Sequence, residues 1–479
     1  MTLVPNHLRQ LNGNKLLFFV LTILCLASSC DALKKVPKEK TPDNDLGAIQ
    51  GQRKYNPKTG KWETTTEVTE PMDTIAWKEP SRETPPPIIS DDVGETVEDG
   101  SVPESEKLGR YKIAVMLPFL SNKLQDMNNR VDEKSMMAID FYGGMKMALD
   151  NLSSRGVKLD VTVLDTEASS SVTKSLLQRP EVRDADILFG PVRTDNLKLV
   201  AAFAKENKKP LVSPLSPSTA VTADNPYYIQ FAPSLISHCE AITNHVRDRY
   251  ETDQVVLVTR NKKAETNRMK YFHDANAKYE GKTVTERFKE FVISDQTADL
   301  NEVVMEPYFL ENKTTVFIVP SWSNEKFVYS LLRKIRTSKG RNKVVVYGMP
   351  QWMSYKRISF DYYEALNVHV SNVIAIDQDA PTTEEFKLNY FYKYGDAPSE
   401  DAFLGYNIMS YVGTLIDKNG SQFQKTIDQE PSNFPSTKFM FDPVPGTNSN
   451  IEKLNEIGRY ENKYVNILEF KDYQFQKAE

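Results

Sequence analysis

Cysteine and histidine are scarce in this chain. Its 479 residues include three cysteines and five histidines. Cys25, Cys30 and Cys239 are too few and too scattered for a disulfide framework or a thiolate metal site. His238 and His245 lie on one predicted helix at a spacing typical of a packed or solvated face. We therefore expect no metal, no cofactor, and a buried, inert thiol at Cys239.

An excess of positive charge is absent as well. Sixty Lys and Arg against 65 Asp and Glu give a formal net charge of −5. Such a chain offers no basic field for a polyanion, so we exclude nucleic acid as a partner. The sequence also has no Gly-x-Ser-x-Gly elbow, no Walker phosphate loop and no His-Glu-x-x-His motif. We therefore predict that the protein is not an enzyme.

No apolar run near the N-terminus is long enough to span a bilayer, which takes about 20 residues. The run Leu16–Ala27 follows Arg9 and Lys15. A short apolar stretch after basic residues is typical of a secretory signal peptide. The alternatives for its end are an ordinary cleavage site and a lipid-attachment site.

The end of that run, Leu26-Ala27-Ser28-Ser29-Cys30, resembles a bacterial lipoprotein signal. Ala27 departs from the pattern, since a large aliphatic residue is usual there. The resemblance implies that residues 1–29 are removed and that Cys30 is lipidated. We therefore expect a periplasm-facing lipoprotein anchored in a membrane of the bacterial envelope, inner or outer.

Residues 30–108 have too few apolar side chains to build a core. They contain the triplet Pro85-Pro86-Pro87 and many Lys, Glu, Asp and Thr residues. Because such a composition does not repay the entropy of ordering, we predict a disordered tether. Tyr55, Trp62 and Trp77 are exceptions. They are either anchors for a partner or parts of short strands flanking the turn signal Asn56-Pro57-Lys58-Thr59-Gly60.

From Tyr111 onward, short apolar runs alternate with segments of helical period. Strand–helix–strand units of this length form parallel sheets with helices on both faces. The alternation starts afresh at Val255, which indicates two sheets. The predicted strands are 113–117, 157–164, 187–189, 211–213, 227–231, 255–258, 284–291, 316–319, 344–347 and 373–376, with a strand-rich end at 464–475. The predicted helices are 134–152, 172–177, 197–204, 235–250, 265–279, 300–310, 326–335, 384–394 and 402–415.

In order, these landmarks resemble the type I periplasmic binding proteins, in the branch of the leucine/isoleucine/valine-binding protein. The resemblance covers about residues 110–479. It rests on Tyr142–Leu149 as a glycine-led first helix, Leu188–Pro191 and Pro210–Pro214 as strand ends, Ala402–Asn407 with its Gly-Tyr pair, and Tyr464–Leu468 as a closing strand.

The resemblance implies an α/β fold of two Rossmann-like lobes, with parallel sheets joined by crossing hinge segments, in residues 109–479. Ligand would lie in the cleft between the lobes, at the carboxyl ends of the strands, and hinge closure would be the working motion. We expect lobe 1 at about 109–233 and 380–433, and lobe 2 at about 234–379 and 434–479.

The resemblance also points to loops that would face the ligand. In amino-acid-binding relatives, the loops after the third and fourth strands hold the ligand carboxylate. Here they contain Arg193 and Thr194, then Ser216, Ser218 and Thr219. Hydroxyls and free N–H groups near helix starts favour an anion. The alternative for Thr194, Ser216 and Ser218 is helix capping.

Lobe 2 of such relatives usually adds an aromatic ring and a carboxylate for the ligand's ammonium group. The matching stretches here contain Trp322, Gln351 and Trp352. A neutral amide at Gln351 cannot neutralise an ammonium ion, and this disfavours free α-amino acids. The two tryptophans suit stacking on a sugar, nucleobase or peptide. The alternative for both is packing in the core.

Two functions remain open at this point. The first is a solute-binding receptor for an amino acid, peptide or sugar-like molecule, as a component of ABC import. The second is a non-transport regulator that binds an envelope protein. It would be similar to the outer-membrane lipoprotein activator of peptidoglycan synthase, which pairs a tether with a lobed domain of this type. A flexible tether of about 75 residues has a root-mean-square span near 50 Å, which favours the second.

Overall fold

The computed structural model describes residues 53–56, 61–64, 108–124, 131–294, 300–434, 436–446 and 457–478. The chain divides into two compact units, Met1–Glu98 and Asp99–Glu479. In the first unit, β1 (Arg53–Asn56) pairs antiparallel with β2 (Lys61–Thr64). Strands therefore flank the predicted turn signal. The predicted signal peptide, Cys30, Trp77 and most of the predicted tether lie outside the described residues.

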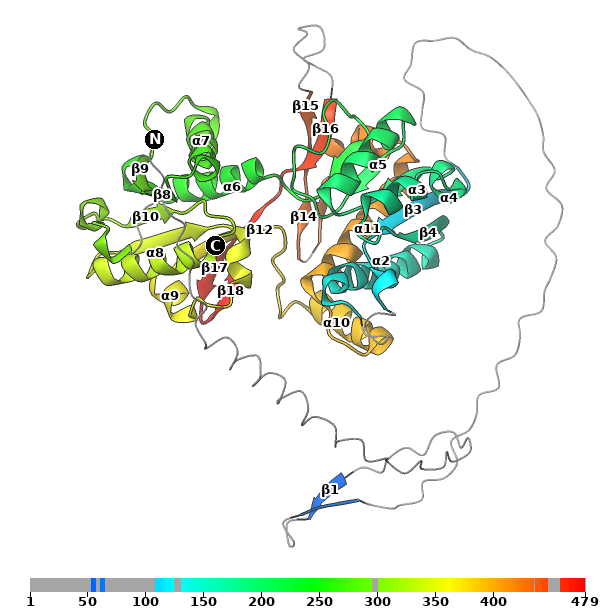
Figure 1. Ribbon diagram of the computed structural model, residues 1–479, viewed down its shortest axis with the longest axis horizontal. Coiled ribbons are helices and arrows are strands. Elements are labelled where there is room, and N and C mark those ends of the chain that lie inside the picture. Colours follow the sequence, from blue (N-terminus) through cyan, green and yellow to red (C-terminus); the bar gives the residue numbers. More distant parts are fainter. Residues whose placement is uncertain are drawn as a thin grey trace, which may run out of the picture. The chain divides into compact units, whose positions relative to one another are not determined.

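The second unit contains two seven-stranded sheets (Figure 1). The first has the order β15-β16-β7-β6-β5-β3-β4. Residues 113–117, in the strand next to the edge strand β4, are almost fully buried, as expected of a parallel strand covered on both faces. Its parallel strands are β3 (Tyr111–Leu117), β4 (Leu159–Asp165), β5 (Ile187–Phe189), β6 (Leu211–Ser213), β7 (Tyr228–Gln230) and β16 (Ile457–Asn462), and β15 (Phe441–Pro445) is antiparallel to β16.

The second sheet has the order β18-β17-β12-β11-β10-β8-β9. Two separate sheets, each with its own buried core, confirm the predicted two-lobed α/β fold. The parallel strands are β8 (Val255–Arg260), β9 (Lys289–Ile293), β10 (Thr315–Ile318), β11 (Val344–Gly348) and β12 (Val368–Asn372), while β17 (Asn466–Lys471) and β18 (Gln474–Lys477) complete it as antiparallel strands.

Helices flank both sheets (Figure 1). Lobe 1 carries α2 (Met136–Ser154), α3 (Ser170–Leu176), α4 (Pro180–Arg183), α5 (Thr194–Glu206), α10 (Pro381–Tyr394) and α11 (Glu400–Asn419). Lobe 2 carries α6 (Leu235–Arg247), α7 (Lys263–Ala277), α8 (Glu325–Ser338) and α9 (Phe360–Ala365). Cys239 is fully buried on α6, which confirms its predicted burial, and desolvation raises the pKa of its thiol. Across the described residues, no helix has the length and apolar composition needed to cross a membrane.

Helices α2 and α11 touch through their backbones. A Cβ placed on Gly144 of α2 would lie 1.8 Å from the carbonyl oxygen of Ala402. A Cβ placed on Gly405 of α11 would lie 2.0 Å from the carbonyl oxygen of Phe141. Only glycine allows such an approach, because any other residue would place a carbon atom inside the neighbouring backbone.

Two predicted elements are wrong. The helix predicted at 300–310 forms only two short 3₁₀ turns, Leu300–Glu302 and Glu306–Tyr308, since Pro307 has no N–H with which to continue a helix. The strand predicted at 373–376 lies five residues earlier, as β12. The apolar run that suggested it is part of a chain crossing, where the Ala375 N–H donates to the carbonyl oxygen of Ser436 at 2.8 Å.

The predicted lobe boundary also needs correction. Residues 434–479 were expected together in lobe 2. Strands β15 and β16 instead extend the first sheet, because β16 pairs with β7, and only β17 and β18 join the second sheet. The lobes are therefore joined by three chain crossings, at 231–234, 373–380 and 463–465.

The crossings are tied to one another by side-chain amides. The Asn462 Nδ2 atom donates to the carbonyl oxygen of Phe231 at 3.1 Å. The Asn466 Nδ2 atom donates to the carbonyl oxygen of Val373 at 2.9 Å. The residues on either side of the third crossing therefore hold both of the others, so a change of angle between the lobes would strain all three together.

Glu461 joins the lobes next to these crossings. Its fully buried carboxylate, on β16 of lobe 1, accepts hydrogen bonds from the Ser234 backbone N–H at 3.2 Å and the Ser237 hydroxyl at 2.7 Å, at the start of α6 in lobe 2. Arg459 and Lys463 lie 2.6 and 3.2 Å from it. Burial alone would raise the pKa of Glu461, but the charge of Lys463 and these hydrogen bonds hold it at about 2.

Candidate functional site

The predicted residues of lobe 1 lie where the strands of the first sheet end. Arg193 is exposed just before α5, and its Nη1 atom donates to the carbonyl oxygen of Ala168 at 3.1 Å. Thr194, half-buried, is the first residue of α5. The loop after β5 therefore meets a helix start, as predicted.

The loop after β6 differs from expectation, because it runs to β7 without a helix. Ser216 is buried there and Thr219 is exposed. The Ser218 hydroxyl accepts a hydrogen bond from the Ala220 N–H at 3.3 Å, so it stabilises a turn. Because no helix begins in this loop, its serines cap no helix and no helix N-terminus faces a ligand there.

Two polar side chains at these strand ends each have one atom without a hydrogen-bond partner among the described residues. Thr166 directly follows β4, and its buried Oγ1 atom makes no hydrogen bond. Asn196, in the first turn of α5, accepts from the Ser170 hydroxyl at 2.9 Å, but its buried Nδ2 atom has no acceptor. Sequence reasoning missed both, since a lone Thr or Asn after a strand carries no distinctive signal.

The acid that ends β4 is engaged by its own chain. Asp165 accepts hydrogen bonds from the backbone N–H groups of Phe119 at 2.9 Å and Ser121 at 2.7 Å, and from the Ser121 hydroxyl at 2.7 Å. Burial alone would raise the pKa of Asp165, but these donors keep it below its usual value. This carboxylate holds the loop after β3 and has little capacity left for a ligand cation.

In lobe 2, Trp322 and Gln351 follow β10 and β11. The half-buried ring of Trp322 packs edge-to-face on His238, with centroids 5.8 Å apart. The Oε1 atom of Gln351 is buried without a hydrogen-bond partner. The hydroxyl of Ser321, fully buried beside Trp322, also lacks one.

Trp352 lies in the core of lobe 2. Its side chain is fully buried, and a Cβ added to Gly348 would fall 2.4 Å from its ring. The indole Nε1 atom donates to the carbonyl oxygen of Ser321 at 3.0 Å. The carbonyl oxygen of Trp352 accepts from the Tyr363 hydroxyl at 2.9 Å. Of the two roles considered for this residue, core packing fits its position, and Trp322 is the aromatic residue left for a ligand.

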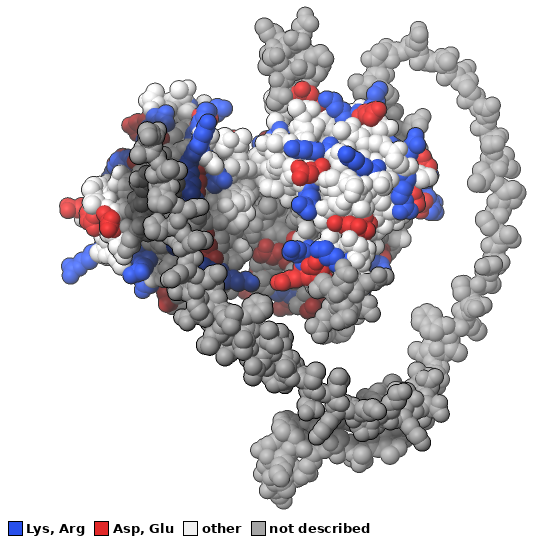
Figure 2. Space-filling model, viewed as in Figure 1, with Lys and Arg blue, Asp and Glu red and all other residues white. Residues whose placement is uncertain are grey.

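Charges of both signs are interspersed over the face of the molecule shown in Figure 2. A mixed surface of this kind creates no strong field of one sign. Among the described residues there is no group of three or more His, Cys, Asp or Glu side chains placed to hold a metal ion. Of the eight predicted ligand residues, only Arg193 carries a charge.

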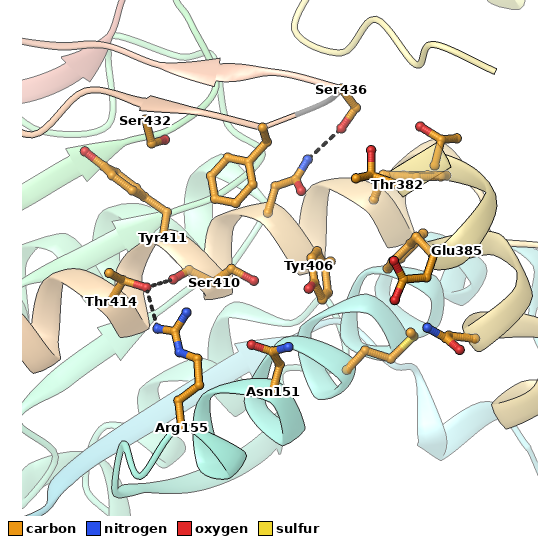
Figure 3. Close-up of a pocket in the computed structure, with 17 residues that line it drawn as sticks. Asn151, Arg155, Thr382, Glu385, Tyr406, Ser410, Tyr411, Thr414, Ser432 and Ser436 are labelled. Carbon is orange, nitrogen blue, oxygen red and sulfur yellow. Dashed lines mark hydrogen bonds between the residues drawn. The ribbon is translucent and has the colours of Figure 1, made fainter. Parts of the chain in front are cut away.

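A separate cavity of about 610 Å³ lies in lobe 1 (Figure 3). We call it the α11 cavity, because polar side chains of α11 line its length. They recur at helical spacing (Asn407, Ser410, Tyr411 and Thr414), a polar stripe on an otherwise apolar helix that could have revealed the cavity from sequence. The other walls are α2, the start of α10 and the hairpin of β13 (Ser432–Asn433) and β14 (Lys438–Phe439).

A second cavity of about 510 Å³ lies where the chain passes between lobes. Residues 374–379 of one crossing and Tyr464 of another line it. Phe434 and Ser436, in the β13–β14 hairpin, line both cavities. None of the eight sequence-predicted ligand residues lines either one.

Comparison with known proteins agrees with this architecture. The family described as "Receptor family ligand binding region" matches residues 142–439, more than half of the chain. No curated protein sequence matches it. A putative branched-chain amino acid ABC transporter from Rhodospirillum rubrum is similar in structure, with a TM-score of 0.54, 12% identity, and coverage of 77% of this chain and 100% of that one.

Two further solved structures are similar to this chain. An ABC transporter substrate-binding protein from Desulfitobacterium hafniense, in complex with Leu, has a TM-score of 0.50 and 15% identity. The match covers 77% of this chain and 100% of that one. Full-length LpoA from Haemophilus influenzae has a TM-score of 0.52 and 13% identity, and 78% of this chain covers 60% of it. At such identities the likeness establishes the fold.

Proposed function

The chain belongs to the receptor ligand-binding family, with the type I periplasmic binding protein fold, and from that premise we propose that it is an envelope receptor that binds a small ligand between its lobes. The supporting observation is a set of four buried polar atoms that have no hydrogen-bond partner among the described residues, in segments that follow the carboxyl ends of strands. They belong to Thr166 and Asn196 in lobe 1 and to Ser321 and Gln351 in lobe 2.

Such atoms are expensive to leave unpaired, at about 1–3 kcal/mol each. The carboxyl ends of strands in open α/β sheets are also where ligands bind. A ligand that reaches both sheets would supply the missing partners. We therefore assign these four residues to the ligand site beside Trp322, together with Arg193 and Thr194 at the start of α5.

The proposed ligand carries no free ammonium group. Gln351 is neutral, and the Asp165 carboxylate is occupied by backbone N–H groups and a serine hydroxyl. A buried ammonium ion without a carboxylate partner would be costly. A neutral sugar-like molecule or a blocked peptide satisfies hydroxyl and amide side chains and can stack on Trp322.

A thermal-shift screen of the full chain against sugars, nucleosides, peptides and amino acids tests this proposal. At about 100-fold excess over Kd, a ligand should stabilise the protein by about 2.7 kcal/mol. Trp322→Ala should abolish most of that shift, whereas Tyr473→Ala, at an exposed aromatic on the β17–β18 turn, should preserve it. Equal shifts in both variants would remove Trp322 from the site, and no shift with any compound would contradict the receptor function.

Membrane attachment through Cys30 is part of the same proposal. Its support is the run of small residues before Cys30 at the end of a signal-like segment. Replacing Cys30 with serine should move the protein from the membrane fraction to the soluble fraction, while Cys25→Ser should leave it in the membrane. A Cys30→Ser protein that stays in the membrane fraction would contradict lipid attachment.

A second function, regulation of an envelope protein, is favoured by exposed apolar side chains on two adjoining helices of lobe 1. The Tyr394 hydroxyl of α10 donates to the Gly143 carbonyl oxygen of α2 at 3.0 Å. Clustered exposed apolar residues mark interaction sites. Met136 and Ile139 of α2 and Leu388, Phe391 and Tyr392 of α10 are exposed apolar residues of these two helices. This function would be supported if no compound in the thermal-shift screen stabilised the protein and if an envelope protein co-purified with it.

A further inference from the structure

We propose that the α11 cavity is a second ligand site, distinct from the interlobe site, and that it binds a neutral carbohydrate. The cavity lies within lobe 1 and shares no residue with the proposed interlobe site. Its volume of about 610 Å³ is in the range of small-molecule pockets.

The floor of the cavity combines aromatic rings with small neutral polar groups. Phe386 and Phe403 are buried, and Tyr406 lies between α10 and α2 in the close-up (Figure 3). The amide of Asn407, nearly fully buried, donates to the Ser436 hydroxyl at 2.7 Å. Neither a carboxylate nor a cation lies among these floor residues.

One floor hydroxyl has no hydrogen-bond partner in the described part of the chain. Thr383, in the first turn of α10, is 2% exposed and lines the cavity, and its Oγ1 atom makes no hydrogen bond. The hydroxyl of Ser432, across the cavity on the β13–β14 hairpin, also lacks one. A purely apolar occupant would leave both hydroxyls unpaired.

Two charged side chains line the cavity, one of each sign, and both are exposed at its rim. Arg155, exposed at the end of α2, donates from Nη2 to the Thr414 hydroxyl at 3.1 Å. Glu385, exposed on α10, lies away from Arg155 in Figure 3. One charge of each sign at the mouth favours neither a phosphate nor a polyamine.

A sugar ring meets these conditions together. Its hydroxyls both donate and accept, so they can pair with Thr383 and Ser432, whose hydroxyls do the same. Its C–H face packs against aromatic rings. The floor of the α11 cavity therefore matches a neutral ring of hydroxyls better than it matches an ion or a hydrocarbon.

Methionine-methyl NMR of the full chain tests the site. Met147 lines the α11 cavity, whereas Met349 is buried at the end of β11 beside the proposed interlobe site. Glucose, maltose and N-acetylglucosamine serve as probes at roughly 20 mM, above the millimolar Kd expected of weak sugar binding. Saturable movement of the Met147 methyl signal by at least one sugar, with Met349 unchanged, is the expected result.

The other outcomes separate this site from the proposed function. Movement of Met349 alone would overturn the α11 site while supporting the interlobe receptor. No movement of either signal with all three sugars would overturn the carbohydrate assignment. Because Met147 and Met349 lie in different lobes, the two failures are distinguishable.

A pair of threonine variants tests the hydroxyl. Thr383→Val keeps the shape of the side chain and should weaken sugar binding about tenfold, the effect of one lost hydrogen bond, without lowering the melting temperature. Thr173→Val is the matched control, since its buried hydroxyl donates to the Ser169 carbonyl oxygen at 2.8 Å. It should lower the melting temperature and leave sugar affinity unchanged. Equal loss of stability in both variants, or unchanged affinity in Thr383→Val, would overturn the role of Thr383.

Discussion

Replacing Gly144 with valine is expected to destabilise lobe 1 by more than about 4 kcal/mol and to abolish most soluble expression. Even a Cβ at this position would lie 1.8 Å from the Ala402 carbonyl oxygen. Because that atom belongs to the α11 backbone, it cannot rotate away as a side chain would. Helices α2 and α11 would have to move apart, and their contact joins the two chain segments that build lobe 1.

Gly109→Val is the control for this change. Gly109 has no atom within 4 Å of an added Cβ, so its replacement should leave stability nearly unchanged. Soluble yield, followed by urea unfolding of whatever folds, measures the difference. Similar yields and unfolding midpoints for the two variants would show that α2 and α11 can separate at little cost in stability, and would contradict this prediction.

Replacing Glu461 with glutamine is expected to lower stability at pH 7 by about 3 kcal/mol. The carboxylate is fully buried, and its pKa of about 2 lies well below the ordinary value of 4.5. Glutamine keeps the shape of the side chain but removes the charge, so Arg459 and Lys463 lose their partner. The hydrogen bonds to the start of α6 would weaken at the same time.

The loss should depend on pH in a defined direction. A carboxylate whose pKa is depressed in the folded state stabilises the fold fully above its unfolded pKa, and this contribution disappears as pH falls toward the folded pKa. The stability gap between wild type and Glu461→Gln should therefore narrow by about 1 kcal/mol between pH 7 and about pH 3.5.

Urea unfolding across that pH range measures the gap. Glu181→Gln is the matched control, because Glu181 forms an ion pair with Arg179 at the surface, with side chains 37% and 49% exposed. Its effect should be small at every pH. A gap for Glu461→Gln that stays constant with pH would show that the carboxylate is not held ionised by its neighbours.

Much of the fold follows from the sequence because its parallel strands are buried on both faces. Val344–Gly348 reads as an uninterrupted apolar run, and such runs alternate with helical periods. The strand β15 escaped prediction for the opposite reason. It is an edge strand whose sequence, Phe-Asp-Pro-Val-Pro, contains two prolines, which normally argue against a strand. Its pairing with β16 could not be inferred from local pattern.

The ligand residues were harder to predict, because a position after a strand does not fix where its side chain points. Trp322 and Trp352 both follow strands, yet one is half-buried and the other lies fully within the core. The 3₁₀ turn Pro350–Ser354 turns Trp352 inward against Gly348. That an atom such as Thr166 Oγ1 lacks a hydrogen-bond partner can be recognised only when the positions of all its neighbours are known.

The order of the strands has a consequence for biosynthesis. The first sheet takes β16 from residues 457–462, and the second takes β17 and β18 from residues 466–477. On the ribosome, neither sheet can therefore acquire its full set of strands until residues this late in the chain have emerged. Until then, β7 in the first sheet and β12 in the second would each expose an unpaired edge, and such edges are where partly folded chains associate.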